Sequence, residues 1–174
     1  MKALGDFDHR LSLAIQGLSE PWQPLMSGVS FLGEPFLVLS VGFAGFISAA
    51  AKNQSHVEHA FIYSVVAFAL STLLKLILRR ERPHELDIKT LGIRSYSFPS
   101  GHAFGTVMFY GLFSYLDFKY LAKPWNILIA LLIWITIMLI GISRVYLKFH
   151  YPSDVLAGWL LGLVSLAIVI SLAF

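Results

Sequence analysis

The chain has 174 residues, a length that suits one domain, and 57% of them are hydrophobic while only 13% are charged. With a mean hydropathy of +0.73, this composition lies far outside the range of soluble proteins and indicates an integral membrane protein. The net charge of +3 is small and no basic tail or stripe is present, which argues against nucleic acid as a partner. Cysteine is absent, which excludes disulfides, thiolate catalysis and cysteine-ligated metals.

The first thirty residues carry an amphipathic pattern. Apolar residues recur there at helical spacing: Leu4, Phe7, Leu11, Ile15 and Leu18. The charged residues Lys2, Asp8 and Arg10 fall elsewhere, so we predict an N-terminal amphipathic helix lying in the membrane interface. Charges in this stretch also argue against a cleaved signal peptide.

Five apolar stretches follow, each near the roughly 20 residues that a helix needs to cross a bilayer. They run over residues 35–51, 57–78, 100–116, 125–142 and 154–174. The sequence therefore predicts an all-α integral membrane protein, a single domain over 1–174 with residues 1–30 at the interface and five transmembrane helices in one bundle over 35–174. Gly158 and Gly162 in the last stretch predict close helix packing.

Five crossings would gather the polar segments on one face of the membrane: the N-terminus, the 75–100 loop and the 143–154 loop. The 52–56 and 117–124 loops and the C-terminus would share the other face. Ten of the thirteen basic residues belong to the first face: Lys2, Arg10, Lys75, Arg79, Arg80, Arg82, Lys89, Arg94, Arg144 and Lys148. The positive-inside rule would make that face cytoplasmic. Basic residues that bind an anionic substrate, however, are present for binding and not because of the positive-inside rule. The number of basic residues on each face therefore leaves the orientation open.

The first polar cluster ends the second apolar stretch. Lys75 and Arg82 are seven residues apart, nearly two helical turns, and so share a helix face, with Pro83 ending the helix. Both cations could meet a single anion. The alternative is snorkelling toward headgroups, which suits Arg79 and Arg80 better than Lys75.

The second cluster, Phe98-Pro99-Ser100-Gly101-His102, directly precedes an apolar helix. Unpaired N–H groups and the dipole at a helix start bind phosphate without a metal, and glycine lets the backbone come close to a ligand. His102 could reach the same anion. The alternative is a plain helix cap followed by an interfacial histidine.

The third cluster, over residues 143–154, joins the last two apolar stretches. His150 and Asp154 lie four apart at a helix start, which predicts a carboxylate-to-imidazole hydrogen bond that fixes the tautomer and frees the other ring nitrogen as a nucleophile. Arg144 adds a planar fork that matches phosphoryl oxygens. The alternative is a basic loop that sets topology, with Asp154 as a helix cap.

Together the clusters resemble the signature of the type 2 phosphatidic acid phosphatase (PAP2) superfamily. That signature has three parts, Lys-x6-Arg-Pro, Pro-Ser-Gly-His and Ser-Arg-x5-His-x3-Asp, and all occur here in order. The matching residues are Lys75, Arg82 and Pro83, then Pro99, Ser100, Gly101 and His102, then Ser143, Arg144, His150 and Asp154. No signature position is substituted, and the match spans residues 75–154.

The resemblance implies a residue-by-residue mechanism. His150 attacks phosphorus, Asp154 orients it, and His102 protonates the leaving oxygen and then activates water. Five groups would hold the phosphoryl oxygens: Lys75, Arg82, Ser100, the Gly101 amide and Arg144. No metal or other cofactor is implied, in keeping with the lack of metal-ligand spacing among the other histidines, which are His9, His56, His59 and His84.

A site drawn from span ends suits a substrate whose chains stay in the bilayer. The family includes phosphatases for phosphatidic acid, phosphatidylglycerol phosphate, undecaprenyl diphosphate and lipid A 1-phosphate, and this short chain looks most like the small bacterial lipid A 1-phosphatases. The resemblance implies a multi-pass protein of the bacterial inner membrane, with its site facing the periplasm or exterior and no obligate protein partner. Four further bases flank the site, either as solvated loop charges or as contacts to a large head group: Arg79, Arg80, Lys89 and Arg94.

Two other functions are weighed. A non-catalytic membrane protein that binds or translocates lipid phosphates would need the cations but not a nucleophile and a proton donor. A helical bundle with snorkelling charges and no site would make the presence of all three clusters a coincidence. We therefore expect a metal-independent lipid phosphate phosphatase that works through a phosphohistidine.

Overall fold

The structure is a computed structural model that describes residues 2–18, 20–83 and 96–174, and over this range it is helical. Seven α-helices and one short 3-10 helix follow one another along these residues. Their bounds are α1 (Lys2–Gln16), η1 (Glu20–Trp22), α2 (Gln23–Leu32), α3 (Pro35–Ala51), α4 (Ser55–Leu78), α5 (Gly101–Tyr120), α6 (Trp125–Tyr146) and α7 (Pro152–Ala173). All five apolar stretches predicted from the sequence are therefore helices.

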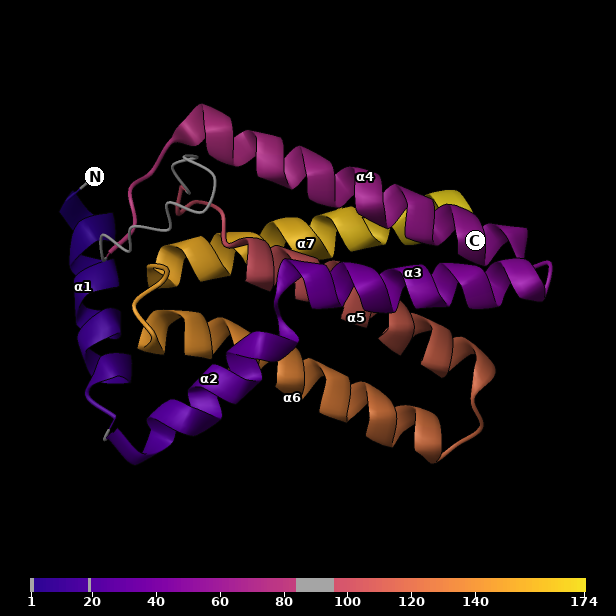
Figure 1. Cartoon of the computed structure of the whole chain (residues 1–174), viewed down its shortest axis with the longest axis horizontal. Coiled ribbons are helices and arrows are strands. Elements are labelled where there is room, and N and C mark those ends of the chain that lie inside the picture. Colours follow the sequence, from indigo (N-terminus) through magenta and orange to yellow (C-terminus); the bar gives the residue numbers. More distant parts are fainter. Residues whose placement is uncertain (1, 19, 84–95) are drawn as a thin grey trace.

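The helices form one bundle whose two ends differ. Figure 1 shows α1 lying across the end where α4 and α6 finish and α7 starts. The opposite end holds the α3–α4 and α5–α6 connections and the C-terminus (Figure 1). The described parts of the segments predicted to share one face thus lie at one end of the molecule.

Fewer helices qualify as membrane spans by length and composition than the five that the sequence analysis predicts. Three helices, α4, α6 and α7, are long and apolar enough to cross a membrane, and α2 with α3 would make a fourth as a span bent by 41°. Helix α5 is not among them. It carries polar residues such as His102 and Thr106 and is the helix with most of its residues buried, so its surroundings are protein and its own residues need not be apolar.

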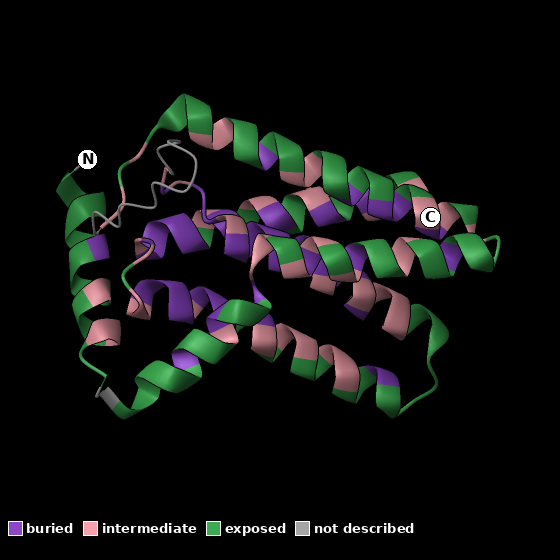
Figure 2. Ribbon diagram, in the orientation of Figure 1, coloured by how far each residue is buried: buried purple, intermediate pink, exposed green. Residues whose placement is uncertain are grey.

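Small residues let α5 and α7 approach closely. A Cβ atom added to Gly158 would lie 2.7 Å from the Ser100 carbonyl oxygen, and one added to Gly162 would lie 2.8 Å from Val107 Cβ. Side chains of α5 such as Phe109 then fill the bundle centre, while the outer helix faces stay exposed (Figure 2). The predicted packing role of Gly158 and Gly162 is confirmed.

Helix α1 turns a charged residue toward the bundle. Asp8 is 2% exposed, whereas the apolar residues Leu4, Phe7 and Leu11 are exposed. Ile15, in the last turn, packs against a small cluster of side chains from α5, α6 and α7. The helix is therefore attached to the bundle by a polar contact as well as an apolar one.

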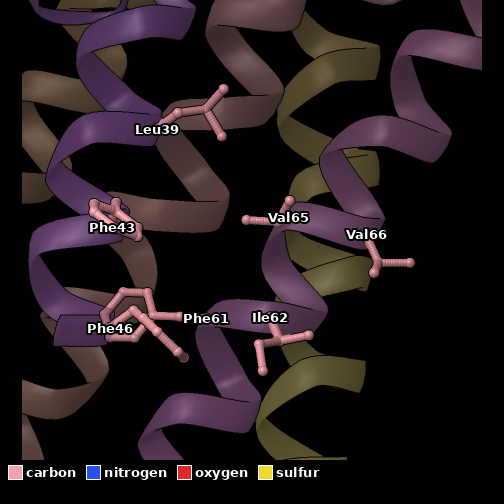
Figure 3. Close-up of a pocket in the computed structure, with 8 residues that line it drawn as sticks. Leu39, Phe43, Phe46, Phe61, Ile62, Val65 and Val66 are labelled. Carbon is pink, nitrogen blue, oxygen red and sulfur yellow. The ribbon is translucent and has the colours of Figure 1, made fainter. Parts of the chain in front are cut away.

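An apolar groove lies between α3 and α4, well away from the polar end of the bundle. It has a volume of about 280 Å³ and is lined by Leu39, Gly42, Phe43, Phe46, Phe61, Ile62, Val65 and Val66. In Figure 3, Val65 of α4 points toward α3, whereas Val66 points away from it. Val66 precedes Lys75 by nine residues, about 14 Å along the helix axis.

The packing of α7 on α5 gives a first prediction. Gly158→Ala places a methyl group against backbone atoms that cannot move aside, so the free energy of unfolding should fall by about 1–3 kcal/mol. Gly28→Ala is the matched control, because nothing lies within 4 Å of its added Cβ and alanine favours a helix. Thermal unfolding in detergent measures both. Equal melting temperatures would show that contact at Gly158 does not limit packing.

Candidate active site

The three clusters meet at the end of the bundle crossed by α1. Lys75 lies in the last turn of α4, His102 in the first turn of α5 and Arg144 in the last turn of α6. His150 lies in the connection to α7, whose first turn holds Asp154. These side chains are close enough for their charges to interact. Residues up to 79 positions apart in the chain therefore share one site.

The start of α5 lies next to the Lys75 ammonium group. Ser100 is the N-cap, its hydroxyl accepts a hydrogen bond from the Ala103 N–H at 3.4 Å, and its own N–H donates to the Asp154 carbonyl oxygen at 3.0 Å. A Cβ atom on Gly101 would lie 3.4 Å from Lys75 Nζ, so glycine allows this close approach. A helix N-terminus next to a lysine favours a bound anion.

His150 and Asp154 are neighbours, but the distance between them is too long for the predicted hydrogen bond. His150 Nδ1 lies 3.6 Å from Asp154 Oδ2, beyond hydrogen-bonding distance. The reason is competition, because Oδ2 already accepts hydrogen bonds from the Ser97 hydroxyl and from the Tyr151 N–H. The Tyr151 contact is part of a capping box for α7. Asp154 thus caps the helix, as the alternative interpretation has it, and also faces the imidazole.

The environment of His150 keeps its imidazole neutral. Burial lowers the pKa of His150 to about 4, the Asp154 carboxylate opposes this shift, and the cations Lys75, Arg82 and Arg144 add to it. At neutral pH the ring therefore has an unprotonated nitrogen with a free lone pair, which a nucleophile requires.

His102 has a partner that the sequence analysis did not identify. Glu34 Oε1 lies 3.2 Å from His102 Nε2. Glu34 is partly exposed and occupies the break between α2 and α3, directly before Pro35. Its signal in the sequence is a charge between Gly33 and Pro35 in an otherwise apolar region.

The two remaining predicted anion ligands are held in place by backbone and ring contacts. Arg144 is 5% exposed, donates from Nη1 to the Ser30 hydroxyl and lies over the Phe149 ring at 4.1 Å. Arg82 donates from Nη1 to the Phe149 carbonyl oxygen at 3.3 Å. The prediction that Arg82 shares a helix face with Lys75 is wrong, because α4 ends at Leu78. Arg144 Nε is buried and has no hydrogen-bond partner within the described residues.

Arg80 differs from its predicted place. Its Nη1 donates to Asp154 Oδ1 and its Nη2 to Asp8 Oδ2, both at 2.6 Å. The interpretation of Arg80 as a snorkelling or solvated loop charge is therefore wrong, because two buried carboxylates need a cation there. Arg79 is exposed and donates to the Leu76 carbonyl oxygen.

Two other histidines singled out from the sequence, His56 and His59, lie apart from this site. His84, Lys89 and Arg94 fall outside the described residues. His56 Nε2 lies 3.0 Å from the Tyr120 hydroxyl at the opposite end of the bundle, and His59 stacks on Tyr63. Over the described part of the chain, no group of three or more His, Cys, Asp or Glu side chains could hold a metal ion.

Comparison with known proteins adds an independent finding. The PAP2 superfamily profile matches residues 57–174. The chain belongs to the PAP2 superfamily. This match covers more than half of the chain and includes all three clusters, and PAP2 relatives named as phosphatases identify the chain as an enzyme of that type.

Individual PAP2 relatives align over different shares of the chain. Phosphatidylglycerophosphatase B of Bacillus subtilis is 27% identical over 92% of this chain and 80% of its own length. A lipid A 1-phosphatase of Rhizobium etli is 34% identical over 59% of this chain and 45% of its own length. The crystal structure of a transmembrane PAP2-type phosphatidylglycerolphosphate phosphatase from Bacillus subtilis superposes with a TM-score of 0.73 and 27% identity, covering 99% of this chain and 87% of that one.

The surroundings of His150 give a prediction about pH. Because the pKa is about 4 when folded and 6.5 when unfolded, the unfolded state binds more protons between these values. Folding stability should therefore fall as the pH drops from about 6.5 toward 4. NMR of protein labelled in its histidine rings, with His150→Gln to assign the signal, should show a resonance titrating near pH 4. Titration near 6.5 would contradict the burial of an uncharged ring.

Proposed function

We propose that this PAP2 enzyme is a metal-independent lipid phosphate phosphatase that works through a phosphohistidine intermediate on His150. The observation that carries the proposal is a buried, neutral imidazole facing a carboxylate at the centre of three cations and a helix N-terminus. A neutral nucleophile surrounded by positive charge suits attack on a phosphoryl group.

The two steps use the two histidines in turn. His150 Nδ1 faces Asp154, so Nε2 attacks phosphorus, forming an N–P bond while the ester P–O bond breaks. His102 gives its proton to the departing oxygen. In the second step His102 takes a proton from water, the water oxygen bonds to phosphorus and the N–P bond breaks, which releases phosphate and restores both rings.

Surrounding charges lower the barrier of both steps. Lys75, Arg82 and Arg144 would stabilise the equatorial phosphoryl oxygens, together with the N–H groups at Ser100 and Gly101. The carboxylate of Glu34, 3.2 Å from His102 Nε2, would orient the His102 ring in the site. With this charge stabilisation, the reaction requires no metal ion.

Several features support a membrane lipid as the substrate. The site lies at one end of a bundle whose helices have exposed apolar faces. The groove between α3 and α4 adds an apolar surface about 14 Å from Lys75 along α4 (Figure 3). Phosphatidylglycerol phosphate, lipid A 1-phosphate and undecaprenyl diphosphate are the substrates to compare. The alignment with phosphatidylglycerophosphatase B over most of both chains favours the first.

The proposed function includes an arrangement of the helices in the membrane. Residues 1–174 would form one domain in which α3 to α7 make five crossings in a bacterial inner membrane. The exposed Leu4, Phe7 and Leu11 would rest α1 in the interface on the periplasmic or exterior side, next to the site. All the groups named in the mechanism come from one chain.

Removal of either histidine tests the mechanism. His150→Ala should lower kcat for phosphatidylglycerol phosphate in detergent by about 10³-fold or more, and His102→Ala by about 10²–10⁴-fold. His56→Ala, at the opposite end of the bundle, is the control and should keep wild-type activity. Phosphate release is the assay. Wild-type activity in His150→Ala would remove it as nucleophile, and tight binding without hydrolysis by the wild type would favour a carrier.

Chelation tests the metal-free site. Because the site's own cations stabilise the phosphoryl oxygens, phosphate release by the purified wild type should be the same with and without an excess of EDTA. Loss of activity that added divalent metal restores would contradict the proposed chemistry.

A further inference from the structure

A buried polar network connects α1 to the start of α7. Asp8 accepts hydrogen bonds from the Ser153 N–H at 2.9 Å, from the Ser153 hydroxyl at 2.7 Å and from Arg80 Nη2 at 2.6 Å. Asp8 is 2% exposed, and none of its partners belongs to its own helix. Such burial of a carboxylate costs several kcal/mol unless a cation and N–H groups satisfy it, as they do here.

Arg80 is the centre of this network. Its Nη1 donates to Asp154 Oδ1 at 2.6 Å and to the Ser153 hydroxyl at 2.7 Å, while Nη2 holds Asp8. The guanidinium also lies 4.3 Å from the centre of the Tyr151 ring. Both terminal nitrogens are thus engaged by carboxylates, which leaves Arg80 unsuited to binding an anionic substrate.

We propose that Arg80 and Asp8 are positioning residues for the Asp154 carboxylate, and that α1 thereby forms part of the active site. The proposal rests on the proposed function, in which Asp154 orients His150. Arg80 fixes Oδ1, while the Ser97 hydroxyl and the Tyr151 N–H fix Oδ2. With both oxygens held, the carboxylate has one orientation toward the His150 ring.

The contact of Arg80 with both Asp8 and Asp154 depends on the shape of the arginine side chain. A guanidinium presents several N–H groups in one plane and can join two carboxylates at once, whereas a lysine ammonium is a single point charge. Lysine at position 80 would keep the charge but could not hold both Asp8 and Asp154 in the present geometry. Asparagine at position 8 would keep an acceptor for the Ser153 N–H but lose the attraction for Arg80.

Two conservative substitutions with matched neighbours test this role. Arg80→Lys is compared with Arg79→Lys, whose side chain is exposed and bonds only a backbone oxygen among its described contacts. Asp8→Asn is compared with Asp6→Asn, an exposed position on the same helix. With phosphatidylglycerol phosphate in detergent micelles, Arg80→Lys and Asp8→Asn should lower kcat by about 10- to 100-fold. KM should change by less than about twofold, and both controls should match the wild type.

A second comparison separates positioning from folding. Because Arg80 acts through Asp154, Arg80→Lys should cause no further loss of kcat in an Asp154→Asn background, whereas a purely structural defect would lower kcat by the same factor in both backgrounds. If Arg80→Lys fails to fold, as judged by its melting temperature, Asp8→Asn in the same two backgrounds takes its place.

The outcomes are distinct. Equal kcat values for Arg80→Lys and Arg79→Lys, or equal proportional losses with and without Asp154, would overturn the positioning role. An inactive wild-type protein would instead count against the proposed function.

Discussion

Asp154 is fully buried, and the site depends on how its negative charge is satisfied, because a carboxylate out of water costs on the order of several kcal/mol without partners. Its partners come from separate parts of the chain: Arg80 beyond the end of α4, the Ser97 hydroxyl before α5, and the Tyr151 N–H at the start of α7. The need to satisfy this one charge therefore brings together the same segments that carry the two histidines and the cations proposed to bind phosphate.

Charge at this end of the bundle is divided between two tasks. Arg80 forms ion pairs with both Asp8 and Asp154, and Glu34 faces His102. Lys75, Arg82 and Arg144 remain as positive charge around the His150 ring. The excess of cations suits a phosphate, whose own charge would complete the balance.

The elements of the fold could be predicted because apolar length and helical periodicity are local signals, and the three clusters could be recognised because each is a short local pattern of residues. The shared helix face predicted for Lys75 and Arg82 is not found, because α4 ends at Leu78. The contacts of Asp8 and Glu34 could not. Asp8 and Arg80 are 72 residues apart, and Glu34 and His102 are 68 apart, so no periodicity links them. The His150 to Asp154 spacing correctly predicts proximity but not distance, since the capping N–H and Ser97 compete for the same oxygen. Helix α5 does not qualify as a span by composition because it carries polar residues such as His102 and Thr106, and other helices bury much of it.

The stereochemistry at phosphorus tests most directly whether phosphate leaves the lipid by way of a covalent bond to His150, as proposed. A lipid thiophosphate made chiral with oxygen isotopes would be hydrolysed in isotopically labelled water and the configuration of the released thiophosphate determined. Each in-line displacement inverts phosphorus, so two successive displacements through the histidine predict net retention. Net inversion would mean a single direct attack by water and would contradict the account.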